Sequence, residues 1–116
     1  MYRISVLYPN EPGSHFDHDY YLNVHFPLAL RLLEPYGITR IEMDRVVEGI
    51  DPSVPPVWHC IGQIYCKSIE GFRQGYADHG AAISGDVTNY TSVRGSVVIS
   101  EIAGEQTPES VAALDG

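Results

Sequence analysis

The sequence predicts an α+β fold with the order β-α-β-β-α-β, in which two helices cover one face of a four-stranded antiparallel sheet, a ferredoxin-like arrangement. Two observations carry this prediction. Residues 2–9, 38–49, 57–66 and 93–102 are rich in β-forming side chains, whereas residues 16–33 and 68–84 have helical periodicity. Stretches containing Pro and Gly separate these segments. The length of 116 residues fits one domain.

The first half of the chain supplies one strand, one helix and a second strand. Alternate residues of 2–9 share one face, which carries Tyr2, Ile4, Val6 and Tyr8. Asp17 is expected to cap the first helix, and the stretch "EPYG" at 34–37 is expected to end it. The strand at 38–49 is more polar than the first, which favours a place at the edge of the sheet.

The second half repeats this order. The strand at 57–66 is apolar on both faces, and Ser68 is expected to cap the second helix. The turn-rich stretch 85–92 leads into the last strand. Residues 1–102 therefore form the predicted domain. Residues 103–116 contain acids but no base, and they form a predicted acidic, flexible C-terminal tail.

A second copy of the chain is the expected partner. Two helices cover only one face of the sheet, and strands that are apolar on both faces would leave a large exposed patch. Packing of two sheets face to face would bury that patch. The sequence therefore predicts a homodimer, a dimeric α+β barrel with a pocket between the helices and the sheet of each protomer.

Charge and hydropathy exclude several classes of partner. The formal net charge is −8, from 15 acids and 7 bases, and no basic stripe is present, so no nucleic-acid partner is expected. The acidic balance also argues against a highly anionic substrate. No apolar run approaches the roughly 20 residues of a membrane span, and no signal-peptide pattern opens the chain. The expectation is a cytoplasmic protein without a membrane partner.

The two cysteines fit a reducing compartment. Cys60 and Cys66 lie six residues apart in one predicted strand. This spacing separates them by roughly 20 Å, whereas a disulfide requires Cα atoms within about 7 Å. Free thiols are therefore expected.

The candidate site lies on the inner faces of the two helices. Asp17, Tyr21 and His25 share a face with two leucines, so this face is expected to turn toward the sheet. His79 lies on the same stripe of the second helix as several apolar side chains. A histidine can act as acid or base near neutral pH. The catalytic candidates are His25, Tyr21 and His79, and the substrate-binding candidates are Asp17, Tyr20, Phe72 and Tyr76.

Structural roles are the alternative for each candidate. The histidines and tyrosines could be core residues with satisfied hydrogen bonds, and Asp17 could serve only as a helix cap. No third ligand accompanies His25 and His79 at a compact spacing, so no metal site and no cofactor are predicted.

Pro27 interrupts the first helix two residues after His25. A proline inside a helix costs roughly 3 kcal/mol, because it lacks an N–H and clashes with the preceding turn. One interpretation is that Pro27 frees the carbonyl of Asn23 and bends the helix, which directs His25 into the cleft. The other is that Phe26 ends one helix and Pro27 begins the next.

The stretch "FDHDYYLNVHFPLALRLL" resembles the EthD family, whose pattern is F-D-x-x-Y-Y-x-x-x-H-x-P-L. The residues that match are Phe16, Asp17, Tyr20, Tyr21, His25, Pro27 and Leu28. The later stretch "YADHGAAISGDVTNYT" is similar to the family's second helix and its exit, with His79, Asp86, Asn89, Tyr90 and Thr91 in place. The likeness covers residues 1–102. The chain departs from the family at "VWHC" and in the acidic tail.

The resemblance implies a small dimeric α+β barrel protein of catabolic or secondary metabolism. Its first implied function is a cofactor-independent enzyme (a lyase, cyclase, isomerase or monooxygenase-like enzyme) that acts on a small aromatic or polyketide-like substrate. In this function His25 transfers a proton. A non-catalytic protein that binds a hydrophobic pathway intermediate is the alternative. The third possibility is a haem-handling barrel with His25 or His79 as axial ligand.

Overall fold

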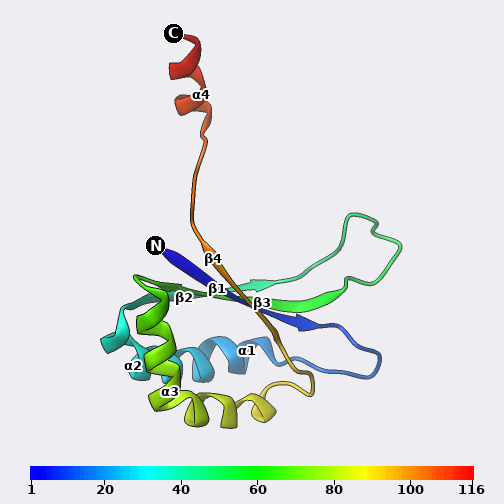
Figure 1. Cartoon of the computed structure of the whole chain (residues 1–116). Helices are drawn as coiled ribbons and strands as arrows, with labels where there is room; N and C mark the ends of the chain where they lie inside the picture. The colour runs from blue at the N-terminus through cyan, green and yellow to red at the C-terminus, as the bar shows by residue number, and fades with distance from the viewer.

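The computed structural model describes all 116 residues and has the predicted α+β, ferredoxin-like order. Four strands form one antiparallel sheet in the order β2-β3-β1-β4, and α1 to α3 lie on one of its faces (Figure 1). The elements are β1 (Tyr2–Pro9), α1 (His18–Tyr20), η1 (Tyr21–His25), α2 (Phe26–Leu33), η2 (Glu34–Tyr36), β2 (Ile38–Arg45), β3 (Trp58–Cys66), α3 (Ile69–Gly85), η3 (Val87–Asn89), β4 (Ser96–Glu101) and α4 (Pro108–Asp115).

The expected helix caps are present. The side chain of Asp17 accepts a hydrogen bond from the backbone N–H of Tyr20, and that of Ser68 accepts one from Gly71. Gly37 ends the first helical region in the left-handed conformation, with φ of 91°. As expected, β2 lies at an edge of the sheet, and both cysteines are free and buried. No helix has the length and apolar character needed to cross a membrane.

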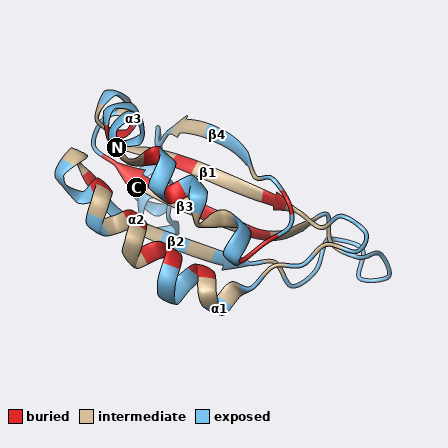
Figure 2. Ribbon diagram, turned by 90° about the horizontal axis from the view of Figure 1, so that it is seen from below, coloured by how far each residue is buried: buried red, intermediate tan, exposed pale blue.

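The core lies between the helices and the sheet and consists of two clusters. One is aliphatic and joins β1, α2 and α3 through residues such as Ile4, Leu33 and Ile83. The other is mostly aromatic and contains Tyr8, Tyr21, Phe26, Cys60, Tyr90 and Val93. In Figure 2 buried positions recur along β1 and α2, whereas the loop between β2 and β3 is largely exposed. The aromatic cluster lies at the end of the sheet where the candidate site is found.

The outer face of the sheet is more polar than expected. Residues paired directly across strands share a face, so Ser5, Gln63 and Glu42 lie together on the side away from the helices. Gln63 also donates to Asp44 at 2.8 Å. The expectation that β3 is apolar on both faces was therefore wrong at its centre. Ser5 donates to Gln63 across the strands, and Glu42 lies 3.5 Å from Nε of Arg40 on its own strand, so these polar groups have partners on the sheet.

Pro27 lies in the first turn of α2, directly after a widened turn of π-helix. In that turn the backbone N–H of Phe26 donates to the carbonyl of Tyr21, five residues back. The backbone remains helical at His25, with φ of −67° and ψ of −45°. The backbone thus stays helical through His25, and Pro27 lies at the start of α2, where a proline needs no N–H. His25 belongs to the wide turn and lines the cavity described below.

The C-terminal tail contains a helix and extends away from the domain. α4 begins with a capping box, in which the side chains of Thr107 and Ser110 each accept from the other's backbone N–H. All residues from Glu101 to Gly116 are exposed, and Figure 1 shows the tail leaving the sheet on the side opposite the helices.

Truncation after Ile102 is expected to leave the melting temperature of the domain nearly unchanged. The removed residues bury no side chain, so their loss costs little apolar burial. A thermal melt followed by circular dichroism checks this result. A decrease of many degrees would show that the tail docks onto the domain or onto a second copy.

Candidate active site

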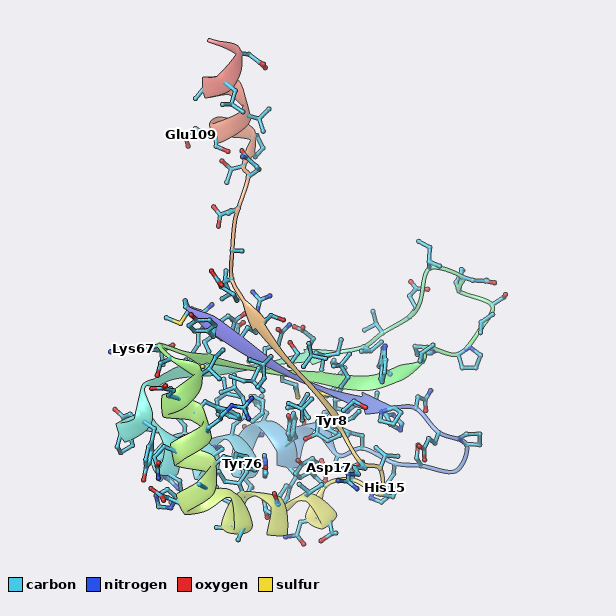
Figure 3. The ribbon with its side chains drawn as sticks, viewed as in Figure 1. Tyr8, His15, Asp17, Lys67, Tyr76 and Glu109 are labelled. Carbon is cyan, nitrogen blue, oxygen red and sulfur yellow. The ribbon has the colours of Figure 1, made fainter.

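A cavity of about 1000 Å³ lies between the helices and the sheet. Side chains of β1, β4, α2 and α3 contribute to its wall, and 17 of its 25 lining residues are hydrophobic. Figure 3 shows Tyr8 of β1 and Tyr76 of α3 on the helix side of the sheet, and both line the cavity. A volume and lining of this kind fit a small apolar molecule.

His25 is the titratable group of this cavity that has a carboxylate partner. Its Nδ1 lies 2.9 Å from Oδ2 of Asp86, and its side chain lines the cavity although only 6 % of the residue is exposed. The π-helical turn supplies His25, whereas Asp86 follows the end of α3. Two helical regions that are distant in sequence thus form an Asp–His pair whose histidine lies at the cavity wall.

Two other side chains hold Asp86 in position. Tyr20 donates its hydroxyl to Oδ1 of Asp86 at 2.6 Å, and the amide of Asn89 donates to the same oxygen at 2.9 Å. Oδ2 is left for the imidazole of His25. Each carboxylate oxygen therefore has a defined role: Oδ1 anchors the group, and Oδ2 orients the histidine.

Burial and hydrogen bonds set the charge state of this pair. Burial lowers the pKa of His25 below 6.5, and the hydrogen bond to Asp86 offsets only part of this effect. Burial raises the pKa of Asp86, but the hydrogen bonds from Tyr20, Asn89 and His25 together outweigh it and leave the pKa below 3.8. At neutral pH Asp86 is ionised and His25 is neutral. Because a carboxylate only accepts, Nδ1 carries the proton and Nε2 presents a lone pair.

A pair of hydrogen-bonded tyrosine hydroxyl groups lies beside Nε2 of His25. The hydroxyl of Tyr90 lies 3.5 Å from this atom and 2.9 Å from the hydroxyl of Tyr8. Burial raises the pKa of Tyr90 and of Tyr8, so both remain neutral phenols that can donate hydrogen bonds. Tyr21 stacks on the imidazole, with ring centroids 5.5 Å apart. The site therefore combines a base with neutral hydrogen-bond donors.

The pH dependence of stability should reveal His25. The pKa of His25 is lower in the folded protein than the ordinary value of 6.5, so this residue contributes stability above that pH. The contribution is lost as the pH falls through the lower folded pKa. His25→Gln is therefore expected to flatten the decrease in the free energy of unfolding below about pH 6.5. Urea unfolding between pH 4 and 8 measures this difference. Curves of equal slope for wild type and variant would contradict it.

The structure brings together some of the predicted site residues. His25, Phe72 and Tyr76 line the cavity. Tyr20 donates a hydrogen bond to Asp86, and Tyr21 packs against the ring of His25. Asp17 is exposed and caps α1, and it does not line the cavity.

His79 lies away from His25, contrary to the expectation that both histidines face one layer. Its Nε2 is 3.4 Å from the hydroxyl of Tyr36, and it does not line the cavity. The buried face of α3 is formed by Phe72, Gly75, Gly80 and Ile83. A Cβ atom at Gly75 would lie 2.9 Å from Leu33, so the glycine lets α3 approach α2 closely. His79 is therefore not one of the buried residues of α3, and its ring contacts Tyr36 instead.

Three residues of the site were not among the sequence-predicted candidates. Asp86, Tyr90 and Tyr8 form the hydrogen-bonded chain around His25. Tyr8 has the signal of strand alternation, which correctly places it on the inner face. Asp86 and Tyr90 match the EthD-like pattern, but no spacing on one element links them to His25.

The fold and the Asp–His pair define a class: a small ferredoxin-like α+β protein with one apolar, histidine-containing cavity. The chain belongs to the EthD family, because the model of the EthD domain matches residues 14–93. Those residues include His25, Asp86 and Tyr90.

Solved structures share this fold. An EthD-like protein from Ralstonia eutropha JMP134 is 30 % identical and has a TM-score of 0.84, with 91 % of this chain and 95 % of that chain covered. An ethyl tert-butyl ether degradation (EthD) family protein from Bacillus halodurans C-125 is 21 % identical, with a TM-score of 0.66 and coverage of 89 % and 99 %. HapK from Hahella chejuensis shares the fold at 16 % identity, with a TM-score of 0.59 and coverage of 92 % and 97 %. No curated protein matches the chain.

Proposed function

We propose that this EthD-family protein is a cofactor-independent enzyme of catabolic or secondary metabolism that transfers a proton on a small aromatic or polyketide-like substrate. The observation that carries the proposal is the Asp86–His25 pair at the wall of an apolar cavity. A buried Asp–His pair is a common way to hold a histidine in the tautomer of a base. The apolar wall fits the body of an aromatic substrate.

The proposed step removes a proton from a carbon next to a carbonyl group. Nε2 of His25 accepts the proton, and the electrons of the C–H bond move onto the carbonyl oxygen to give an enolate. The hydroxyl of Tyr90 donates a hydrogen bond to this oxygen, because it is a neutral phenol close to Nε2. Asp86 stabilises the imidazolium formed at His25. Return of the proton from His25 to another carbon of the delocalised enolate completes an isomerisation. In an elimination the enolate instead expels a hydroxyl group from the β-carbon, and the proton on His25 leaves with it as water.

Hydrogen–deuterium exchange on a surrogate ketone tests this step. The probe is 3,5-dihydroxyphenylacetone in D₂O, whose benzylic CH₂ signal is followed by proton NMR. Wild type is expected to accelerate the loss of this signal, and His25→Gln is expected to reduce the acceleration by about 10²-fold or more. His79→Gln is the matched control, since His79 lies outside the cavity.

The same experiment separates the enzyme from a binding protein. Wild type that binds the ketone without accelerating exchange would favour a non-catalytic carrier of a hydrophobic intermediate. Equal exchange rates for wild type and His25→Gln would show that His25 is not the base. A visible absorption spectrum of the purified protein tests the haem-handling alternative, since bound haem absorbs strongly near 400 nm.

We further propose that the protein is a homodimer whose second copy covers the outer face of the sheet. The helices leave this face open (Figure 1), and it carries Leu7, Ile61 and Val98 between the polar pairs. On the same face Nε of Arg3 is buried without a hydrogen-bond partner. An orphaned buried donor is costly, and an acidic second copy would offer it an acceptor.

Sedimentation velocity at micromolar concentration is expected to give a dimer. The interface should bury well above the roughly 1,000 Å² expected of a specific contact. Ile61→Lys is expected to shift the protein toward monomer, whereas Val47→Lys, in the exposed loop after β2, leaves the dimer intact. A monomeric wild type would contradict the proposal.

A further inference from the structure

The charged side chains of the cavity are positive, whereas the chain as a whole is negative. The protein carries 15 acids and 7 bases. None of the residues lining the cavity is an Asp or a Glu, whereas Arg73 and Arg94 both line it. Arg73 lies on α3, and Arg94 lies just before β4. The one cavity of this size in an acidic protein is therefore cationic at its rim.

Neither arginine is engaged by the protein itself. No side-chain hydrogen bond, salt bridge or aromatic contact involves Arg73 or Arg94, and both residues are exposed. Three other arginines do have partners: Arg40 approaches Glu42, Arg45 approaches Asp19, and Arg3 lies over the ring of Tyr65. The two guanidinium groups at the cavity thus keep their donors free for a ligand.

The acid nearest to the chemistry does not oppose these charges in the cavity. Asp86 does not line the cavity, and its carboxylate is occupied by Tyr20, Asn89 and His25. The rest of the wall is largely aliphatic and aromatic, with residues such as Ile4, Phe72 and Ile99. The site is therefore apolar within and cationic at its mouth.

We propose that the ligand of this cavity carries a carboxylate, which Arg73 and Arg94 recognise at the rim while the apolar body lies inside. The proposal deepens the proposed function and rests on it for the place of the reacting carbon beside His25. A guanidinium group presents paired N–H donors that match a carboxylate. The excess of acids elsewhere repels anions from other surfaces and favours their capture here.

Two ligands that differ in one group provide the test. The probes are 3,5-dihydroxyphenylacetate and 3,5-dihydroxyphenylacetone, which share the ring, the CH₂ group and the carbonyl carbon. Isothermal titration calorimetry at low ionic strength compares their affinities. Wild type is expected to bind the carboxylate about tenfold or more tightly than the ketone. This ratio should decrease in high salt, because the two arginines are exposed.

Variants assign the preference to the two arginines. The double variant Arg73→Gln/Arg94→Gln is expected to bind both probes with nearly equal affinity, while its affinity for the ketone stays near that of wild type. Each single variant should lower the ratio by a part of this effect, and the single variants serve if the double variant does not fold. Arg31→Gln is the matched control, since Arg31 lies in a separate, smaller groove beside α2 and should keep the wild-type ratio.

Several results would overturn the proposal. These are equal affinities in wild type, a ratio that survives in the double variant, or no binding of the carboxylate at millimolar concentration. Its failure is distinguishable from failure of the proposed function. If the protein exchanges the protons of the ketone but does not prefer the carboxylate, only the recognition by arginine is refuted. If it prefers the carboxylate but its exchange does not depend on His25, proton transfer is refuted and the recognition by arginine stands.

Discussion

Asp86→Asn is expected to lower the rate of ketone exchange by about 10²- to 10⁴-fold with the fold intact. An Asn side chain can place its carbonyl oxygen where Oδ1 now accepts from Tyr20 and Asn89. Its amide nitrogen then faces Nδ1 of His25, where Oδ2 lies at 2.9 Å in the native protein. An amide donates to Nδ1 and drives the ring proton onto Nε2. The imidazole would keep its position but lose the lone pair that acts as base.

The tautomer of His25 provides a readout beyond activity. Nitrogen-15 spectra of the imidazole at neutral pH are expected to show the proton on Nδ1 in wild type and on Nε2 in the Asn variant. If Asp86 had only a structural role, its substitution would change the stability of the protein without moving the ring proton from Nδ1 to Nε2. Asp78→Asn is the matched control, because Asp78 of α3 also accepts from a tyrosine, Tyr36, at 2.6 Å but does not pair with His25. A fully active Asp86→Asn variant would show that Asp86 does not position the base.

The placement of His25 could be predicted from sequence because it depends on local periodicity. Tyr21 and His25 of the expected face are buried, and the cap at Asp17 that sets the start of the helix is a short-range signal. The two ends of that face differ from the expectation, because Asp17 is exposed and the buried residues of α2 are Phe26, Ala29 and Leu33. The π-helical turn at residues 21–25 adds one residue to this turn and was not predicted. The sequence shows only that Pro27, which has no N–H to donate, follows this turn.

The partners of His25 could not be predicted by the same means. Asp86 and Tyr90 lie 61 and 65 residues further along the chain, so their contacts depend on how α3 and η3 pack against the first helical region. The misplacement of His79 has the same origin. The prediction for the second helix followed its apolar side chains and therefore ignored glycine. Gly75 and Gly80, however, are two of the four buried residues of α3. Of the expected stripe, only Phe72 and Ile83 are buried, because glycine positions supply the rest of the close contact.

Gly62→Ala is expected to destabilise the protein by about 2–3 kcal/mol, the range of overpacking in a tight core. Gly62 lies on β3, and a Cβ atom there would overlap the hydroxyl of Tyr21 and lie 3.2 Å from its Cζ. Tyr21 cannot move away, because it is 3 % exposed and its ring is fixed by Phe26 and Tyr90, with centroids at 4.6 and 4.8 Å. Urea denaturation measures the change. Gly49→Ala is the control, since no atom lies within 4 Å of its added Cβ.

A double variant should identify the hydroxyl of Tyr21 as the obstacle. Tyr21→Phe removes the atom that a Cβ at Gly62 would overlap and leaves only the tight contact with Cζ. Gly62→Ala is therefore expected to cost at least about 1 kcal/mol less in the Tyr21→Phe background than in wild type. Because Tyr21 stacks on His25, Gly62→Ala alone should also slow ketone exchange, and the second substitution should restore part of the rate. An equal cost of Gly62→Ala in the wild-type and Tyr21→Phe backgrounds would show that the strain does not come from the hydroxyl of Tyr21.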